Sequence, residues 1–511
     1  MITPKQSYRL ACLASCIMIL APTGAMAQSA PAPAPGSNQL NGATPAATAS
    51  QSPTPGTADV PSVPSAPSPG EPGFIDSLGT RKTLLGDAYG IRPNLGRYGV
   101  SLGITDTEEV LGNPSGGTRQ GVIYEGLTQL NLGIDTQKAF GWEGGTFNVS
   151  ALQIHGRGLT QNDINSLKTV SNIEAKRATR LWELWYQQSF AGGRADIKIG
   201  QQSLDQEFIA SVYGGLFVNS AFAWPVLTSA DLYSGGPAFP LASLGVRGRV
   251  QVTDHVTVLG GVFDDNPPGG SFYDNLQVRG AAKSGTSFNL NTGALFIAEV
   301  QYATNPARAG NAPAAGQSGL PGVYKFGGWF DSGQFAVQSQ ARVQGLDRSG
   351  TPMRPTELLR HDWSLYATAD QALWAPVPGG PQTVAVFGRA MGAPGDRNLV
   401  SVSLNGGIVL KAPTASRPQD SVGIGFGYNR IGDRARLLDR QSLEAGYLGN
   451  SVRNAEAFVE TTYQARLTPW ATLQPDAQYV ISPGGNITKP DGSGQRVKNA
   501  LILGLRSTIT F

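Results

Sequence analysis

Two arginines, Arg247 and Arg249, stand two positions apart in the stretch GVRGRVQV. Val246, Val250 and Val252 occupy the opposite parity, so the stretch has the pattern of a β-strand with one apolar and one polar face. On such a strand the two guanidinium groups lie about 7 Å apart along one wall. Each presents a planar fork of N–H donors, which suits the hydroxyl groups of a polar solute and also carboxylates.

Ionisable side chains recur on the polar parity of other alternating segments, namely Glu125, Lys198, Arg389, Glu460 and Arg506. If the polar faces line one enclosed space, these side chains surround it with donors and acceptors. Two roles are open to each of them: contact with a solute in that space, or pairing across it to hold the wall rigid.

Aromatic residues flank an acid in the stretch RLWELWYQQ. Trp182 and Trp185 are three positions apart and must face opposite sides of a strand. If Glu183 is on the polar face, Trp185 joins it as a candidate stacking platform for a ring, or it packs beneath a loop. Trp182 and Tyr186 then belong to the apolar or interfacial face.

Catalytic and metal-binding motifs are not found in this sequence. The three histidines, His155, His255 and His361, lie outside any nucleophile or metal-ligand motif. We therefore expect no enzymatic activity, no metal and no cofactor, with a hydrolase active at a barrel rim as the main rival. The 39 basic and 36 acidic residues give a net charge of +3, which indicates no nucleic-acid partner.

The elements that must position these residues are alternating segments, for example VIYEGLTQLNLGID and VGIGFGYN. One face of each is apolar and the other is polar or small. This pattern fits a soluble sandwich or a transmembrane barrel. Short links at residues 190–194, 253–255 and 468–470 alternate with long ones. A transmembrane barrel typically has short turns at one end and long loops at the other, so this pattern favours the barrel.

The predicted fold class is all-β: a transmembrane antiparallel β-barrel of about sixteen strands over residues 97–511, with long extracellular loops and short periplasmic turns. The links at residues 303–322 and 412–420 are long for turns, so the count could differ by two. The loop at residues 203–242 is apolar without sustained alternation, and we expect it to fold into the barrel mouth and narrow the pore. The loop at residues 159–177 has helix-compatible spacing and is expected to pack beside it, the alternative being an extra strand pair.

Three pieces precede the predicted barrel. Residues 1–27 have the basic, apolar and small-residue parts of a cleaved signal peptide, and they contain the only cysteines, Cys12 and Cys16. The LASC motif at Cys16 leaves lipoprotein-type cleavage as an alternative. Residues 28–73 are rich in Ala and Pro and are expected to form a disordered periplasmic tether, followed by a short helical lead-in at residues 74–96 that contains TLLGDAYGI.

The chain ends on the alternating segment NALILGLRSTITF, with Phe511 on its apolar face. We expect this strand to close the barrel against the first one, near RYGVSLGIT, with its aromatic end at the periplasmic interface. A C-terminal Phe on such a strand also resembles the signal by which outer-membrane assembly machinery recognises its clients.

Several blocks occur in one order over residues 84–511, among them VSNIEA, ELWYQQ, IKIGQQSLDQEF, GLFVNSAFAWP, SGGPAFPLASLGVRGR, GVYKFGGWFDSGQF and FGRAMGAPGDRNLVS. In these blocks the sequence resembles the carbohydrate-selective porins of the OprB type. The resemblance implies a passive, water-filled channel for small sugars such as glucose in a Gram-negative outer membrane, with arginines, acids and aromatics at a constriction. Carbohydrate solutes and membrane lipid are the implied partners, and both a monomer and a homo-oligomer are compatible with it. A non-selective solute porin is a further alternative.

Overall fold

The computed structural model describes residues 78–267, 284–288, 290–305, 319–338, 357–377, 380–444, 451–491 and 493–511. The predicted signal peptide and tether, residues 1–73, lie outside this part of the chain. Within it, no helix is both long and apolar enough to cross a membrane.

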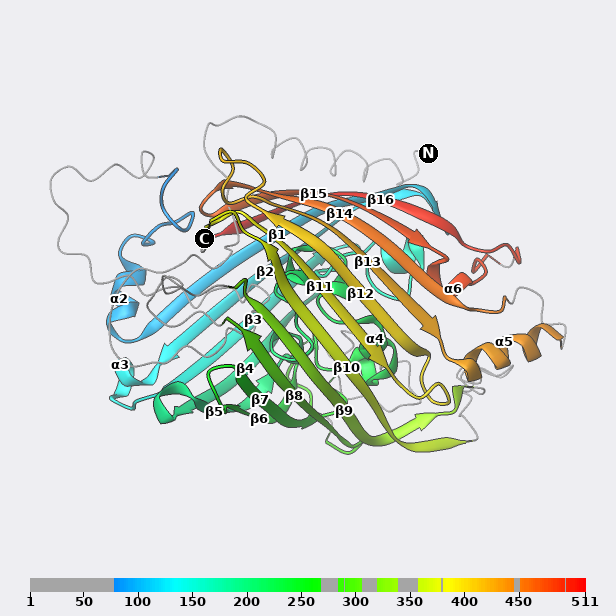
Figure 1. Ribbon diagram of the computed structural model, residues 1–511, viewed down its shortest axis with the longest axis horizontal. Coiled ribbons are helices and arrows are strands. Elements are labelled where there is room, and N and C mark those ends of the chain that lie inside the picture. Colours follow the sequence, from blue (N-terminus) through cyan, green and yellow to red (C-terminus); the bar gives the residue numbers. More distant parts are fainter. Residues whose placement is uncertain are drawn as a thin grey trace, which may run out of the picture.

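Sixteen strands make up one closed barrel in the described residues, and each strand runs antiparallel to its neighbours (Figure 1). The strands are β1 Val100–Gly117, β2 Gly121–Asp135, β3 Gly145–Gly156, β4 Ala178–Phe190, β5 Ala195–Gln202, β6 Ser243–Gln251, β7 Val256–Asp264, β8 Ala294–Thr304, β9 Gly322–Ala336, β10 Leu358–Trp374, β11 Thr383–Gly392, β12 Val400–Lys411, β13 Ser421–Ile431, β14 Ala455–Thr468, β15 Ala471–Ile481 and β16 Lys498–Thr510.

Short helices occupy the ends and the loops of the barrel. They are α2 Ile91–Arg97, α3 Thr136–Phe140, α4 Val226–Asp231, α5 Asp433–Glu444 and α6 Pro483–Asn486, with one π-helical turn at Thr160–Ile164.

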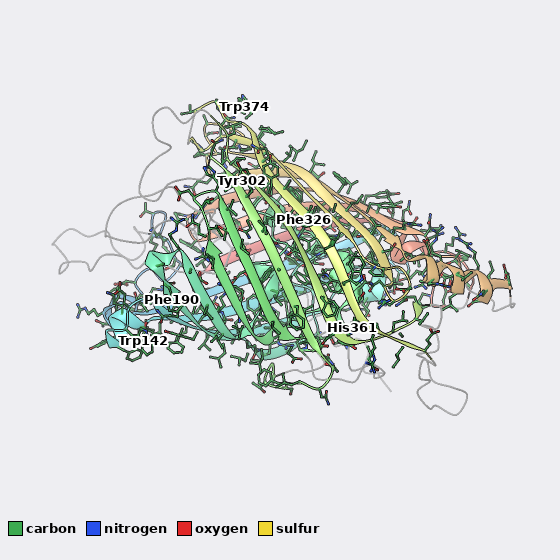
Figure 2. The ribbon with its side chains drawn as sticks, turned by 60° about the horizontal axis from the view of Figure 1, so that its bottom comes forward. Trp142, Phe190, Tyr302, Phe326, His361 and Trp374 are labelled. Carbon is green, nitrogen blue, oxygen red and sulfur yellow. The ribbon has the colours of Figure 1, made fainter. Side chains whose placement is uncertain are left out.

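The alternation in the sequence becomes an apolar exterior and a polar interior. On β6, Val246 and Val250 are 47% and 48% exposed on the outside, whereas Arg247 between them is buried inside. Phe326 on β9 also points away from the barrel (Figure 2). A closed barrel with an apolar outer face spans a membrane, so the predicted fold class is confirmed and the soluble sandwich is excluded.

Aromatic side chains gather on the outer surface toward the end that carries the short turns. Trp142, Phe190, Tyr302 and Trp374 are exposed there, in the link after β2 or near the ends of β4, β8 and β10 (Figure 2). Such a belt marks the interface between the hydrocarbon and the aqueous phase.

The connections have the predicted asymmetry. Residues 191–194, 252–255 and 469–470 form short turns at one end, and residues 157–177 and 203–242 form long loops at the other. The two doubtful links, after β8 and after β12, each join consecutive barrel strands. One long-loop-end connection is nevertheless short, because only residues 118–120 join β1 to β2.

The lead-in before β1 differs from its helical prediction. Residues 81–90 form turns and bends, and α2 begins only at Ile91. Gly86 and Gly90 have φ angles of 59° and 83°, and Ala88 and Tyr89 are also left-handed, so a right-handed helix cannot run through them.

The barrel closes where β16 pairs with β1. Thr105 lies opposite Thr510, and the Phe511 N–H donates to the Ile104 carbonyl at 2.9 Å, as the sequence predicted. The lead-in adds further contacts at this seam. The Leu84 N–H donates to the Thr510 carbonyl at 2.8 Å, and the Arg92 guanidinium donates to the Phe511 carbonyl.

Candidate functional site: a lumen narrowed by two loops

The loop between β5 and β6, residues 203–242, lies inside the barrel and fills much of its interior. Phe208, Phe217 and Phe222 are each 1% exposed and belong to one apolar cluster with inward-facing strand residues. The Phe222 ring packs edge-on against Phe458 of β14, with ring centroids 5.5 Å apart. The expectation that this loop folds into the barrel is confirmed.

Glycines of β13 allow the aromatic rings of this loop to pack closely against the barrel wall. A Cβ at Gly423 would lie 2.8 Å from the Phe217 ring, and one at Gly425 would lie 2.6 Å from the Phe222 ring. The glycines that alternate with the apolar residues in VGIGFGYN lie on the inner face of β13, and they leave room for the loop's aromatic rings.

Arg389 of β11 is the main polar anchor of the loop. It is 4% exposed and donates to the carbonyls of Ile209 at 2.8 Å and Phe222 at 2.5 Å, and also to those of Ala221 and Ala223. A guanidinium suits this task because its fork of donors reaches several carbonyls at once.

Two of the predicted lumenal acids accept backbone N–H groups of the same loop. Glu460 of β14 accepts from Val218 at 2.6 Å and from Asn219 at 3.0 Å. Glu183 of β4 accepts from the Ser203 N–H at 3.0 Å. These carboxylates hold the loop in place.

Three further anchors were not singled out from the sequence, although they share the same polar parity. Glu299 of β8 accepts from the Ile209 N–H at 2.9 Å, Lys325 of β9 donates to the Ala210 carbonyl at 2.8 Å, and Asp370 of β10 accepts from the Ser211 hydroxyl at 2.5 Å. Strand parity predicts that these three side chains face the lumen. Which lumenal side chains contact the loop depends on the path of the loop, which parity does not give.

The loop between β3 and β4, residues 157–177, packs beside the first one, as predicted, but with a single π-helical turn in place of longer helical structure and with no extra strand pair among its residues. Its Asn172 N–H donates to the Val218 carbonyl at 2.8 Å, which joins the two loops. Arg506 of β16 pairs with Glu109 and donates to the Asn172 side chain at 2.6 Å. Glu125 is 2% exposed on the wall next to these groups.

The remaining predicted residues meet in one charged network on the inner faces of β4, β5 and β6. Arg247 pairs with Asp196, and its Nε lies 2.6 Å from Glu207 Oε2. Arg249 also pairs with Asp196, at 2.5 Å. Lys198 pairs with Glu207. The ion pairs named here join three cations to two acids, and the buried Glu183 carboxyl lies close enough for its charge to interact with Lys198.

Trp185 faces into this network, as predicted. The Lys198 ammonium lies 4.4 Å from the centre of its ring. Although burial alone would raise the pKa of Glu207, the charges of Lys198 and Arg247 hold it down, to about 2. Glu207 thus remains a carboxylate well below neutral pH.

A bulge in β4 overturns one predicted orientation. Ser150 of β3 pairs with Glu183 and Ala151 pairs with Leu181, so Trp182 is the extra residue. Because a bulge reverses the alternation, Trp182 and Glu183 both face inward.

Trp182 is therefore not on the lipid or interfacial face, and that prediction is wrong. It is 4% exposed, its ring packs edge-on against Phe239, and its Nε1 donates to the Leu241 carbonyl at 3.3 Å. Tyr186, beyond the bulge, does lie on the outer face, where its ring centroid is 4.6 Å from that of Phe147.

A model of the carbohydrate-selective porin, OprB family, matches residues 119–511. The chain belongs to this family. Porin B of Pseudomonas aeruginosa is 23% identical over 450 residues, which cover 84% of this chain and 91% of that protein. A putative porin of Acinetobacter baylyi, QuiX, is 24% identical over 454 residues, covering 84% and 93%. The high-pH structure of Pseudomonas putida OprB shares the fold, with a TM-score of 0.70, 22% identity, and coverage of 85% of this chain and all of that one.

One buried arginine of this porin was not predicted from the sequence to face the lumen. Arg180 of β4 pairs with Leu152 and faces inward, 4% exposed, and among the described residues its Nε and Nη1 have no hydrogen-bond partner. Counting parity back from Glu183 places it outside, because the count passes through the bulge at Trp182. A bulge has no reliable mark in this stretch of sequence.

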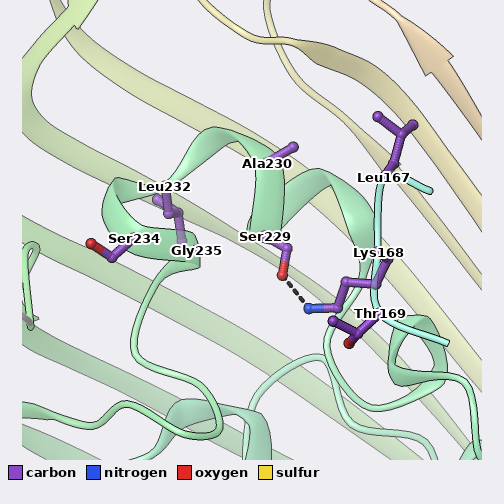
Figure 3. Close-up of a pocket in the computed structure, with 8 residues that line it drawn as sticks. All are labelled: Leu167, Lys168, Thr169, Ser229, Ala230, Leu232, Ser234 and Gly235. Carbon is purple, nitrogen blue, oxygen red and sulfur yellow. Dashed lines mark hydrogen bonds between the residues drawn. The ribbon is translucent and has the colours of Figure 1, made fainter. Parts of the chain in front are cut away.

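A cavity of about 350 Å³ lies between the two inward loops (Figure 3). Lys168 and Thr169 line it from the first loop, and Ser229 and Ser234 line it from the second. The Lys168 ammonium donates to the Ser229 hydroxyl across it. The volume is in the range of small-molecule sites. No group of three or more His, Cys, Asp or Glu in the described ranges is placed to hold a metal ion.

Proposed function

We propose that this porin gives passive, carbohydrate-selective diffusion of small sugars such as glucose across the outer membrane, through a water-filled lumen narrowed by its two inward loops. The observation that carries the proposal is the anchoring of residues 203–242 by polar side chains all around the wall, with Arg389 and Glu460 on one side and Glu183 on another. A loop held in this way sets a fixed bore.

Selection among polar solutes then depends on the groups that line the bore. A sugar offers hydroxyl groups to donors and acceptors and an apolar ring face to an aromatic side chain, and each contact must be weak enough to release it. Arg249, Lys198 and Trp185 combine these features in one network. We assign them solute contact, and we assign Arg247, Arg389 and Glu460 chiefly to holding the wall and the loop.

Export and assembly follow the same proposal. Residues 1–27 direct the chain through the inner membrane and are cleaved, and residues 28–73 act as a spacer in the periplasm. Phe511 presents the last strand to the assembly machinery of the outer membrane. The proposal assigns no catalytic residue, in keeping with relatives named porins.

Two measurements on the purified barrel test this function. In planar bilayers we expect steady ion conductance that glucose reduces in a concentration-dependent way. In liposome swelling we expect uptake to fall steeply from mono- to disaccharides. Equal uptake of sugars, amino acids and other solutes of one size would instead identify a non-selective porin, and a sealed membrane with hydrolytic activity would identify a rim enzyme.

A further inference from the structure

The cavity between the two inward loops combines charged, hydroxyl and apolar groups. Lys168 and Thr169 line one side of it, and Ser229 and Ser234 line the other (Figure 3). Lys168 is 7% exposed and is the one charged side chain in the lining. The cavity therefore offers a solute one ammonium group, three hydroxyl groups and an apolar surface. The remaining lining residues are Leu167, Ala230, Leu232 and Gly235.

Hydrogen bonds to the barrel wall hold both sides of the cavity in place. Glu456 of β14 accepts from the Leu167 N–H at 2.8 Å. Asp231, the last residue of α4, accepts from the Val400 N–H of β12 at 3.1 Å. A site that is ordered before its ligand arrives loses little conformational freedom when the ligand binds.

The cavity lies on the long-loop side of the inward loop. Even-numbered strands begin at that end of the barrel, and Val400 and Glu456 are the first and second residues of β12 and β14. Arg249 lies two residues before the end of β6, which leads into a short turn at the other end. A solute that enters from the long-loop end therefore meets the cavity before it meets the charged network around Arg249.

The lining groups suit one sugar ring. An ammonium group donates three hydrogen bonds, and hydroxyl groups both donate and accept, so together they match the hydroxyl groups of a sugar. Leu167 and Leu232 offer an apolar surface to the C–H groups of a ring. The volume of about 350 Å³ is near the lower end of the range for small-molecule sites, roughly 300–1,000 Å³, which favours one ring over a chain of rings.

We propose that this cavity is an entry subsite that binds one monosaccharide ring, with Lys168 as its specificity-determining donor. The inference rests on the proposed function and adds to it a binding site on the long-loop side of the constriction. The Lys168 ammonium exchanges its hydrogen bond to the Ser229 hydroxyl for bonds to the sugar. A small anion would need the ammonium group alone, whereas a sugar also uses the hydroxyl groups and the apolar surface.

Thiol labelling of a cysteine placed in the cavity tests the subsite directly. The sequence has cysteines only at positions 12 and 16, inside the predicted signal peptide, so the introduced thiol of Ala230→Cys is unambiguous. Glucose at about ten times its half-protecting concentration should slow labelling of this variant of the full mature chain roughly tenfold. Sucrose should protect much less, because the cavity has room for one ring.

The matched control is Val212→Cys, on the same loop but on its short-turn side. The Val212 N–H donates to Asp370 at 3.2 Å, and Asp370 lies opposite Val323, the second residue of β9. Glucose should leave the labelling of this control unchanged. Equal protection of the two cysteines by glucose, or protection of Ala230→Cys by sucrose or inorganic phosphate as strong as that by glucose, would overturn the proposal.

A second variant tests the role of the ammonium group. Combining Lys168→Met with Ala230→Cys should raise the half-protecting glucose concentration roughly tenfold or more, the loss expected for one hydrogen bond from a charged donor. Lys176→Met removes an exposed lysine of the same loop and should change nothing. An unchanged concentration in a folded Lys168→Met barrel would refute the role of Lys168. If that barrel does not assemble, the comparison of Ala230→Cys with Val212→Cys still decides.

Current block by glucose separates failure of the subsite from failure of the proposed function. Wild-type channels that glucose blocks, together with an unprotected Ala230→Cys, would refute the subsite and leave the sugar channel standing. Channels that glucose neither blocks nor crosses would refute the channel itself. Because the cavity faces the long-loop side, Lys168→Met should weaken block by glucose added on that side and not by glucose added on the other.

Discussion

Replacing Arg389 by methionine should release the inward loop and widen the pore. The side chain donates to the carbonyls of Ile209 and Phe222 at 2.8 and 2.5 Å, and to two more between 3.2 and 3.3 Å. Methionine fills similar space but offers no donor. The carbonyls of Ile209, Phe222 and Ala223 lose the guanidinium, whereas that of Ala221 keeps the Asn405 side-chain amide as a donor at 3.1 Å. A buried acceptor left without a donor costs about 1–3 kcal/mol, so three carbonyls cost roughly 3–9 kcal/mol. The equilibrium between the inward and released loop then shifts by roughly two orders of magnitude or more.

The assay compares single-channel conductance and liposome swelling for the wild type, Arg389→Met and Arg434→Met. Arg434 is an exposed arginine of α5 outside the lumen and serves as the matched control for loss of one positive charge. We expect Arg389→Met to conduct more current with larger fluctuations and to admit disaccharides that the wild type excludes. Retained heat-modifiable mobility on gels would show that the barrel itself is folded. A folded Arg389→Met barrel with wild-type conductance and size limit would refute the view that this arginine sets the bore.

Four further outcomes follow from the structure. Replacing Arg247 and Arg249 together by methionine removes two positive charges and leaves Asp196 and Glu207 in the lumen. The reversal potential in a salt gradient should therefore shift toward cation preference, and sugar should block the current less strongly. Unchanged values in both measurements would mean that these arginines only stabilise the wall. Glu207 has its pKa lowered from 4.5 to about 2 in the folded chain, so it stabilises the fold above pH 4.5 by up to about 3 kcal/mol and loses this contribution as the pH falls toward 2. The thermal midpoint of the wild type should therefore drop more between pH 6 and pH 3 than that of Glu207→Gln, and parallel curves would contradict this. Deleting Phe511 should lower the amount of barrel in the outer membrane without changing the conductance of the molecules that do assemble, as measured by surface labelling and single-channel recording. Deleting residues 29–68 should leave sugar uptake intact, and lost uptake with a folded barrel would show that this segment gates the pore.

Strand alternation made the barrel predictable from the sequence. Val246, Val250 and the two arginines between them took the faces that parity assigns, since side chains on a strand must alternate. The same rule failed at Trp182, because one extra residue in β4 reverses the alternation and the sequence does not mark it. Parity counted back from Glu183 would also put Arg180 outside, although it faces inward.

The roles of the lumenal residues were less predictable than their positions. Parity put Arg389 and Glu460 inside, but their partners are backbone groups of residues 203–242. Those contacts depend on how a loop of irregular structure folds across the barrel, which no periodic pattern describes. The helical prediction for TLLGDAYGI failed for a different reason. Gly86, Ala88, Tyr89 and Gly90 all have left-handed backbone angles, so a right-handed helix cannot form there.

The pairing of β1 with β16 has a consequence for how the barrel assembles. The hydrogen bond from Arg92 to Phe511 joins residues 419 positions apart, so the two ends of the barrel segment meet only after everything between them has been made. Any sheet that β1 forms before β16 pairs with it has an unpaired edge, which can join another strand. Leu84 and Arg92, which hydrogen-bond to the end of β16 at this seam, lie before β1 in the chain, so their contacts form only when the last strand is in place. The β1 edge therefore needs protection until β16 pairs with it, and a fault at either end of the barrel segment leaves an exposed sheet edge that favours aggregation.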